Sequence, residues 1–189
     1  MNTPAHLIFG VAAFGKRGQP RITAAAAAGA LIPDLSLYVM VGVSIWVLGI
    51  EPRVVFRELY YSDAWQQVFA IDNSFVLWGA LLAVALWFRR PALTAFAGAA
   101  LLHLAFDFPL HNHDARMHFW PISAWVFESP VSYWDGKYHA QVVGPLELGV
   151  SMILCLLLWI RFRRWWMRAL IVLLGTAEFL SSGIWQFIF

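Results

Sequence analysis

The feature that most constrains the fold is a series of long apolar stretches separated by short basic runs. The main stretches cover residues 22–50, 74–88, 92–108, 146–160 and 169–189. The basic runs are Lys16-Arg17 with Arg21, Arg89-Arg90, and the four arginines at positions 161, 163, 164 and 168. A helix of about 20 apolar residues crosses the roughly 30 Å hydrocarbon core of a bilayer. The pattern therefore predicts an all-α, polytopic transmembrane helical bundle.

Composition supports a membrane setting. Of the 189 residues, 61% are hydrophobic and only 13% are charged, whereas soluble domains carry roughly a quarter charged residues. Lipid must then cover much of the apolar exterior. The net charge of +2 and the scattered basic runs argue against a nucleic-acid partner. One cysteine, Cys155, provides neither a disulfide nor a thiolate metal site within one chain.

About six helical segments are expected in a single domain spanning residues 1–189. The first is short, from Pro4 to Phe14 with Thr3 as its N-cap, and reaches only half-way across a bilayer. Pro33 should kink the second segment. Residues 51–73 read as an interfacial loop or helix, and the segments on either side of Arg89-Arg90-Pro91 should be antiparallel neighbours. A long polar loop, residues 109–145, precedes the last pair of helices.

The basic residues also predict an orientation. If the segments alternate, nine lysines and arginines fall on one side of the membrane and four on the other. The richer side is expected to be cytoplasmic. Both termini and the loop 109–145 would then be extracytoplasmic.

Six ionisable side chains lie inside apolar segments: His6, Asp34, His103, Asp107, Glu147 and Glu178. Each costs roughly 2.5 to 3.5 kcal/mol at mid-helix on insertion scales, so each is a candidate functional residue. Counting from the nearest basic run at 1.5 Å per residue puts all six at similar depths, about 15 to 25 Å away. One shared polar site is the simplest explanation.

The spacing of these residues favours a metal site. His103 and Asp107 are four residues apart and share one helical face. His111, His113 and Asp114 follow at once, so imidazoles and carboxylates continue into the loop. Such ligands suit zinc, manganese or non-haem iron. We expect His6, Asp34, His103 and Asp107 as the ligands of a divalent metal ion, zinc first. The alternative is a structural or proton-linked polar network.

Three other groups have competing interpretations. Glu147 fits a carboxylate favoured by the dipole at a helix N-terminus, and Glu178 fits either the site or a hydrogen bond between helices. The aromatic residues around His118 and Trp134 indicate an interfacial belt, with a lid over the site as the alternative. His139 has no partner by spacing and is expected at the surface.

The arrangement of His6, of Pro33-Asp34 after Gly29-Ala30-Leu31-Ile32, and of His103 with Asp107 resembles a bacterial family of inner-membrane metal-dependent hydrolases. The resemblance covers about the first 114 residues. It implies a multi-pass protein of the bacterial inner membrane whose Pro-Asp pair and histidines bind metal. Family members commonly carry a second aspartate soon after the Pro-Asp pair, where this chain has Leu35 and Ser36.

Two functions of different classes follow. The first is a metal-dependent hydrolase of a lipid or lipid-linked phosphoester or acyl substrate, with its site facing the extracytoplasmic side. His111, His113 or Asp114 would complete the metal shell or act as general base, and Arg116 would hold an anionic head group. The second is a small transporter or membrane subunit that binds metal or protons without hydrolysis. A third possibility is a membrane-anchored scaffold for another protein, whose function would not depend on His103 and Asp107.

Overall fold

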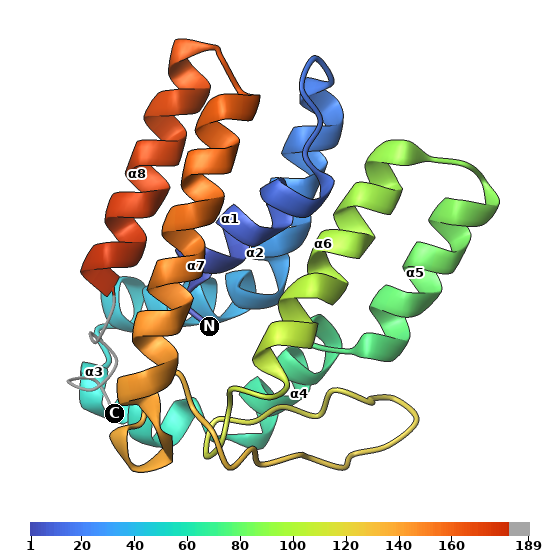
Figure 1. Cartoon of the computed structure of the whole chain (residues 1–189). Coiled ribbons are helices and arrows are strands. Elements are labelled where there is room, and N and C mark those ends of the chain that lie inside the picture. Colours follow the sequence, from blue (N-terminus) through green and yellow to red (C-terminus); the bar gives the residue numbers. More distant parts are fainter. Residues whose placement is uncertain (182–189) are drawn as a thin grey trace.

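A computed structural model describes residues 1–181 of the chain, and these residues form an all-helical structure (Figure 1). The main helices form three hairpins, which pair α1 (Thr3–Phe14) with α2 (Pro20–Gly42), α5 (Phe75–Trp87) with α6 (Pro91–Asp107), and α7 (Ala140–Arg161) with α8 (Trp165–Ser181). Prolines begin α2 and α6, where a missing backbone N–H is harmless. The expected hairpin around Arg89-Arg90-Pro91 is confirmed.

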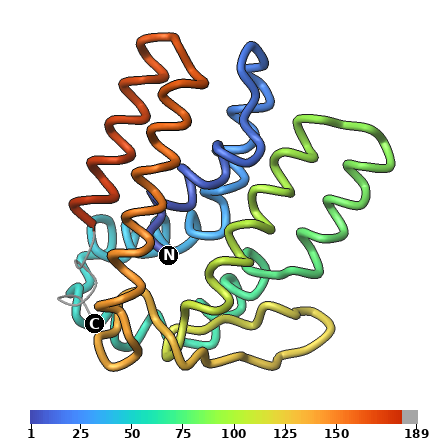
Figure 2. The backbone as a smooth tube through the Cα atoms, in the orientation of Figure 1, coloured from blue at the N-terminus to red at the C-terminus, as the bar shows by residue number. Residues whose placement is uncertain are grey.

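Short helices cross the end of the bundle opposite the hairpin turns. The π-helical segment Val43–Val47 extends α2, and α3 (Pro52–Val54), a second π-helical segment (Val55–Leu59) and α4 (Asp63–Asp72) follow. Most of the region expected to be an interfacial loop or helix is therefore helical. The loop between α6 and α7, broken by a 3₁₀ turn at Gly136–Tyr138, lies at the same end (Figure 2).

Small residues bring the central helices close together. The core between α2 and α6 contains Ala26, Ala30, Ala95 and Ala99. At Gly10 of α1, a Cβ atom would lie 2.6 Å from the Cβ of Ala30. Small residues permit such close backbone approach between helices in lipid. The helices α1, α2 and α6 therefore form the tightest part of the structure.

Among residues 1–181, three helical stretches are long and apolar enough to cross a membrane. They are Pro20–Val47, which is α2 with the π-helical segment after it, Asp63–Trp87, which is α4 followed by α5, and Ala140–Arg161, which is α7. This is fewer than the six or so segments expected from the sequence. The apolar helices α1 and α6 fall short because their 12 and 17 residues rise only about 18 and 25 Å, against a hydrocarbon core of about 30 Å.

Several expected boundaries were wrong. Asn2, not Thr3, is the N-cap residue of α1, because the Thr3 side chain bonds to Asp34 instead. The loop ends before Ala140 rather than at residue 145, since α7 accommodates Pro145 in its second turn. The last helix begins at Trp165 rather than Ala169, and the rest of its expected range, 182–189, lies outside the described residues. Pro33 lies inside α2, which continues past it, and the kink expected there stays a prediction.

The close contact between α2 and α6 gives a stability prediction. A Cβ atom at Gly29 would overlap the Phe96 carbonyl, lying 2.7 Å from its carbon, so Gly29→Ala must push the two helices apart. We expect a loss of about 1–3 kcal/mol or more, measured as reduced thermal stability in detergent. The control is Gly79→Ala in α5, where a Cβ meets open space and alanine favours the helix. Equal stability of both variants would contradict the packing.

Candidate metal centre

Two imidazoles and one carboxylate meet between α1 and α6. The Nε2 atom of His6 lies 2.8 Å from Oδ1 of Asp107, and Nε2 of His103 lies 3.0 Å from Oδ2 of the same carboxylate. The two rings are stacked, with centroids 3.4 Å apart and planes 8° from parallel. All three residues are at most 5% exposed. They form a group whose donor atoms all lie within 4.8 Å of one another.

Local structure explains why the three meet. His103 and Asp107 are one turn apart on α6, so their side chains project from the same face. The close approach at Gly10 holds α1 against α2 and α6, where a Gly10 Cβ would also lie 3.4 Å from the Cβ of Ala99. His6, one turn before Gly10, is thereby brought against the His103 ring.

A backbone carbonyl fixes the orientation of His103. Its Nδ1–H donates to the Ala30 carbonyl at 2.8 Å, which leaves the lone pair of a neutral ring on Nε2. Within residues 1–181 this buried Nε2 makes no hydrogen bond, although it faces Asp107. Metal-binding histidines commonly donate their second N–H to a carbonyl or carboxylate in this way. His103 therefore has the arrangement of a metal ligand.

Asp34 of α2 lies at the edge of the group. Its Oδ1 is 3.6 Å from Nε2 of His103, and its Oδ2 accepts a 2.5 Å hydrogen bond from the Thr3 hydroxyl. The Tyr38 hydroxyl is 2.6 Å from the same Thr3 oxygen. Thr3 and Tyr38 thus orient Asp34 beside the two histidines.

His111 approaches Asp107 from the loop. Its Nδ1–H donates to Oδ2 of Asp114 at 2.7 Å, and its Nε2 is 3.4 Å from Oδ1 of Asp107. Burial disfavours the imidazolium, but the Asp114 and Asp107 carboxylates outweigh it and raise the pKa of His111 to about 9. Burial opposes the charge on Asp114, yet His111 beside it lowers the pKa of Asp114 to about 2. These two residues form an ion pair next to Asp107.

Arg116 is held by aromatic residues at the same pocket. Its Nη2 donates to the Tyr60 hydroxyl at 2.6 Å, and its guanidinium lies 4.0 Å from the Phe69 ring centroid. Cation–π contact with Phe69 fixes the plane of the guanidinium. In the described part of the chain, the buried Nη1 has no hydrogen-bond partner. Arg116 therefore keeps a donor available for an anion.

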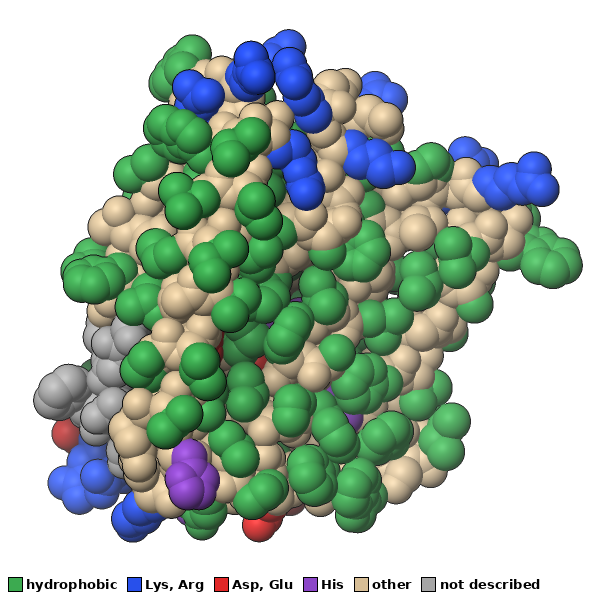
Figure 3. Space-filling model, in the orientation of Figure 1, with side chains coloured by type: hydrophobic (Ala, Val, Ile, Leu, Met, Phe, Trp, Pro, Cys, Tyr) green, Lys and Arg blue, Asp and Glu red, His purple; other side chains and the backbone are tan. Residues whose placement is uncertain are grey.

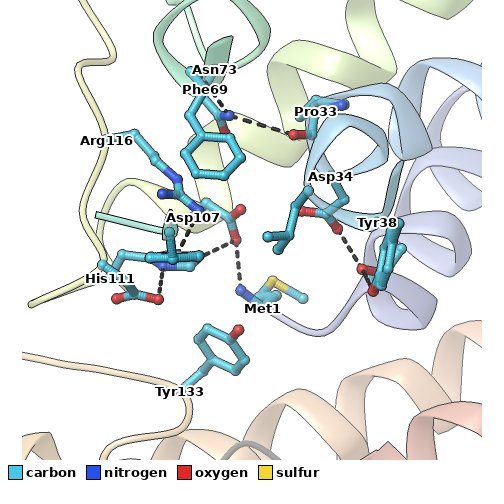
Figure 4. Close-up of a pocket in the computed structure, with 14 residues that line it drawn as sticks. Met1, Pro33, Asp34, Tyr38, Phe69, Asn73, Asp107, His111, Arg116 and Tyr133 are labelled. Atoms are coloured by element: carbon cyan, nitrogen blue, oxygen red, sulfur yellow. Dashed lines mark hydrogen bonds and ion pairs between the residues drawn. The ribbon is translucent and has the colours of Figure 1, made fainter. Parts of the chain in front are cut away.

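A small cavity of about 40 Å³ lies beside the three-residue group (Figure 4). Figure 4 shows Asp107 between the Met1 amino group and His111, with Tyr133 and Asp34 on other sides. The Met1 ammonium donates to Oδ1 of Asp107 at 2.6 Å. The volume is enough for water, because one water needs about 10–15 Å³ of such space.

The structure thus brings together most of the residues selected from the sequence: His6, Asp34, His103, Asp107, His111, Asp114 and Arg116. His113 lies apart from them. Its side chain is exposed, and its ring contacts Tyr138 at a centroid distance of 5.3 Å. The polypeptide turns between His111 and Asp114, so the side chain of His113 faces outward. His139 is exposed, as expected.

Glu147 and Glu178 form a second polar group instead of joining the first. The Asn2 backbone N–H donates to Oε1 of Glu147 at 2.7 Å, and the Asn2 side-chain amide donates to Oε1 of Glu178 at 3.4 Å. Both glutamates are buried. The sequence analysis predicted one shared site for all six ionisable residues. In the structure Glu147 and Glu178 instead gather around Asn2, apart from the group at Asp107.

Sequence reasoning did not select the tyrosines that line the cavity as site residues: Tyr38, Tyr60 and Tyr133. Tyr133 belongs to the aromatic stretch for which a lid over the site was the alternative interpretation. Tyr38 carried a usable signal, because it follows Asp34 by four residues and shares its helical face. Tyr60 and Tyr133 come from an irregular helix and a loop, where residue spacing does not predict direction.

The donor set fits a divalent transition metal. His6, His103 and Asp107 offer two imidazole nitrogens and a carboxylate, a ligand set that zinc accepts while keeping a fourth position for water. The buried Nε2 atom of His103, which has no hydrogen-bond partner within residues 1–181, supports this assignment, since buried polar atoms normally have partners and a cation would supply one. Asp34, whose Oδ1 lies 3.6 Å from Nε2 of His103, is near enough to complete the coordination.

Comparison with known proteins gives no further guide. No protein-family model, curated protein or solved structure matches the chain.

Asp107 is the residue on which metal binding should depend most. We expect Asp107→Ala to lose bound metal while remaining inserted in the membrane, because both imidazoles lose their shared carboxylate. The measurement is metal content by mass spectrometry of protein purified in detergent. His113→Ala serves as the control and should keep the wild-type content, since His113 faces away. Full occupancy in Asp107→Ala would remove Asp107 from the ligand set.

Proposed function

We propose that this protein is a membrane-embedded, metal-dependent hydrolase of a lipid or lipid-linked phosphoester. The observation that carries the proposal is the convergence of His6, His103 and Asp107 beside a cavity that His111 and Arg116 also line. The sequence resemblance to bacterial inner-membrane hydrolases supports the same assignment.

The proposed setting is the bacterial inner membrane, crossed several times, with the site toward the extracytoplasmic side. Three membrane-length helices support this setting, and the shorter α1 and α6 contribute the site residues. Lysines and arginines gather at the end where the three hairpins turn, at the top in Figure 3. The loop over the site lies at the opposite end (Figure 1). Positive residues favour the cytoplasm, which supports this orientation.

His6, His103 and Asp107 would hold the metal, with Asp34 beside them. A divalent ion here supplies a Lewis acid that polarises the scissile group and makes a bound water more acidic. Zinc is our first choice because imidazole with one carboxylate is a common zinc ligand set, and manganese and iron accept the same atoms.

Two other residues would supply proton transfer and substrate binding. His111, fixed at Nδ1 by Asp114, would transfer a proton at Nε2 to or from the reacting oxygen. Arg116 would bind the substrate anion through its unpaired Nη1. A half-buried cation whose Nη1 is shielded from solvent favours a phosphoester over a neutral acyl ester, so we place phosphoesters first.

Substrate entry requires a conformational change. The cavity of about 40 Å³ holds water but not a lipid head group. The loop 108–139 supplies His111, Asp114 and Tyr133 to its lining, so displacement of this loop would open the cavity. Lids that close over an active site commonly exclude water in this way.

The polar group at Glu147 and Glu178 supports a second candidate, proton-linked transport. Each glutamate is buried and, among residues 1–181, has one carboxylate oxygen without a hydrogen bond. Intramembrane carboxylates of this kind occur in proton relays. This function would require Glu147 and Glu178 but no metal at His103.

The hydrolase proposal is tested by turnover of lipid phosphoesters. We expect His111→Gln to lower kcat by about 100-fold or more, the usual range for loss of a proton-transfer group. Arg116→Gln should raise KM more than it lowers kcat, because its role is binding. The assay measures phosphate release from detergent-solubilised substrates, with acyl esters tested in parallel.

His113→Gln is the matched control for both variants and should keep wild-type turnover. Metal-loaded wild-type protein that cleaves neither phosphoesters nor acyl esters would contradict hydrolysis. Proton-driven uptake by reconstituted protein that Glu178→Gln abolishes and His103→Ala leaves intact would favour transport.

A further inference from the structure

A second, larger cavity lies at the other end of the molecule from the loop. It has a volume of about 720 Å³ and runs between the α1–α2 hairpin and the α7–α8 hairpin. Its walls are apolar and include Leu7, Ile8, Val11, Leu170 and Leu174. The volume lies within the range of about 300–1,000 Å³ that is usual for ligand sites. We call this cavity the basic-rim groove, after the residues at its mouth.

Hydrogen bonds and a buried apolar cluster hold the walls of the groove in place. Arg161 at the end of α7 donates through Nη1 to the Ala12 carbonyl at 2.7 Å and to the Gly15 carbonyl at 3.3 Å. These bonds satisfy carbonyls at the C-terminal end of α1 and tie the two hairpins together. Leu158, Phe162 and Met167 belong to a buried cluster along its floor. The groove is therefore fixed at its basic end by a hydrogen-bonded clamp.

Four cations stand at the mouth of the groove: Lys16, Arg17, Arg163 and Arg164. All four are exposed, and none takes part in an ion pair within the described residues. The sequence offers no nearby compensation, because residues 1–33 and 148–177 contain no aspartate or glutamate. The rim is thus an uncompensated positive cluster next to an apolar channel.

This combination selects one kind of ligand. An apolar channel takes an acyl chain, and a positive rim takes an anionic head group. Basic pockets between transmembrane helices bind anionic lipid head groups. A zwitterionic lipid would gain less from four uncompensated cations, and a free phosphate would leave the apolar walls unfilled.

We propose that the basic-rim groove binds an anionic phospholipid, with an acyl chain in the channel and the phosphate on Lys16, Arg17, Arg163 and Arg164. This lipid is distinct from the substrate. The helix α1 rises about 12 Å from His6 to its end at Phe14, so a phosphate at the rim stays away from the metal centre. The groove is therefore a separate lipid site that joins two hairpins.

The test is native mass spectrometry of the purified protein titrated with three probes. These are dioleoyl phosphatidylglycerol, dioleoyl phosphatidylcholine with the same chains, and glycerol 3-phosphate as a head group alone. We expect phosphatidylglycerol to bind most tightly. The double variant Arg163→Gln/Arg164→Gln should weaken it by about tenfold or more. Ala24→Phe, which fills the groove from an exposed wall position, should weaken both lipids.

Arg89→Gln/Arg90→Gln is the control. These two arginines lie at the turn of the α5–α6 hairpin and do not line the groove, and their substitution removes the same charge. An equal loss of phosphatidylglycerol binding in this control would mean general attraction to the surface and would overturn the proposal. Equal binding of phosphatidylcholine would overturn it as well. Metal content and hydrolysis should not change in the groove variants, so the lipid site and the proposed reaction fail separately.

Discussion

The Asp107 carboxylate faces the Nε2 atoms of two stacked imidazoles, His6 and His103, and the rest of the structure is arranged around this contact. Burying a carboxylate and two histidines in an apolar bundle is unfavourable unless each polar atom has a partner. The Met1 ammonium and His6 are partners of one Asp107 oxygen, and the His103 ring lies 3.0 Å from the other. The arrangement is reachable only because glycine and alanine let α1, α2 and α6 approach closely. The buried polar contacts at Asp107 thus depend on the packing of small residues between the helices.

The surrounding residues extend this constraint outward. The Ala30 carbonyl orients His103, Thr3 orients Asp34, and Asp114 orients His111. Each supporting contact joins segments distant in sequence, except the local pair in the loop. The same bundle carries a different chemistry at its other end, where exposed cations surround an apolar groove. The molecule thus has a buried polar centre toward one end of its helices and a basic rim at the other.

Sequence patterns predicted the features that depend on local spacing. The half-length first helix and the α5–α6 hairpin were predicted from the apolar stretches and the short basic runs between them. The common face of His103 and Asp107 was predicted from the helical repeat. The depth count also brought His6 and Asp34 to the same level. Features that depend on irregular backbone were missed. Nothing in the spacing shows that His111 turns inward and His113 outward, that Thr3 serves Asp34 rather than a cap, or that Asn2 links Glu147 with Glu178.

X-ray absorption spectroscopy at the metal edge of the purified protein is the most direct test of the central claim. It reports which atoms surround the metal. A stoichiometric divalent metal with two imidazole nitrogens and carboxylate oxygen at about 2.0–2.2 Å is the predicted result. The imidazole scattering should fall in the His103→Ala variant. Protein that stays free of metal after reconstitution, or a metal shell without imidazole, would contradict the account.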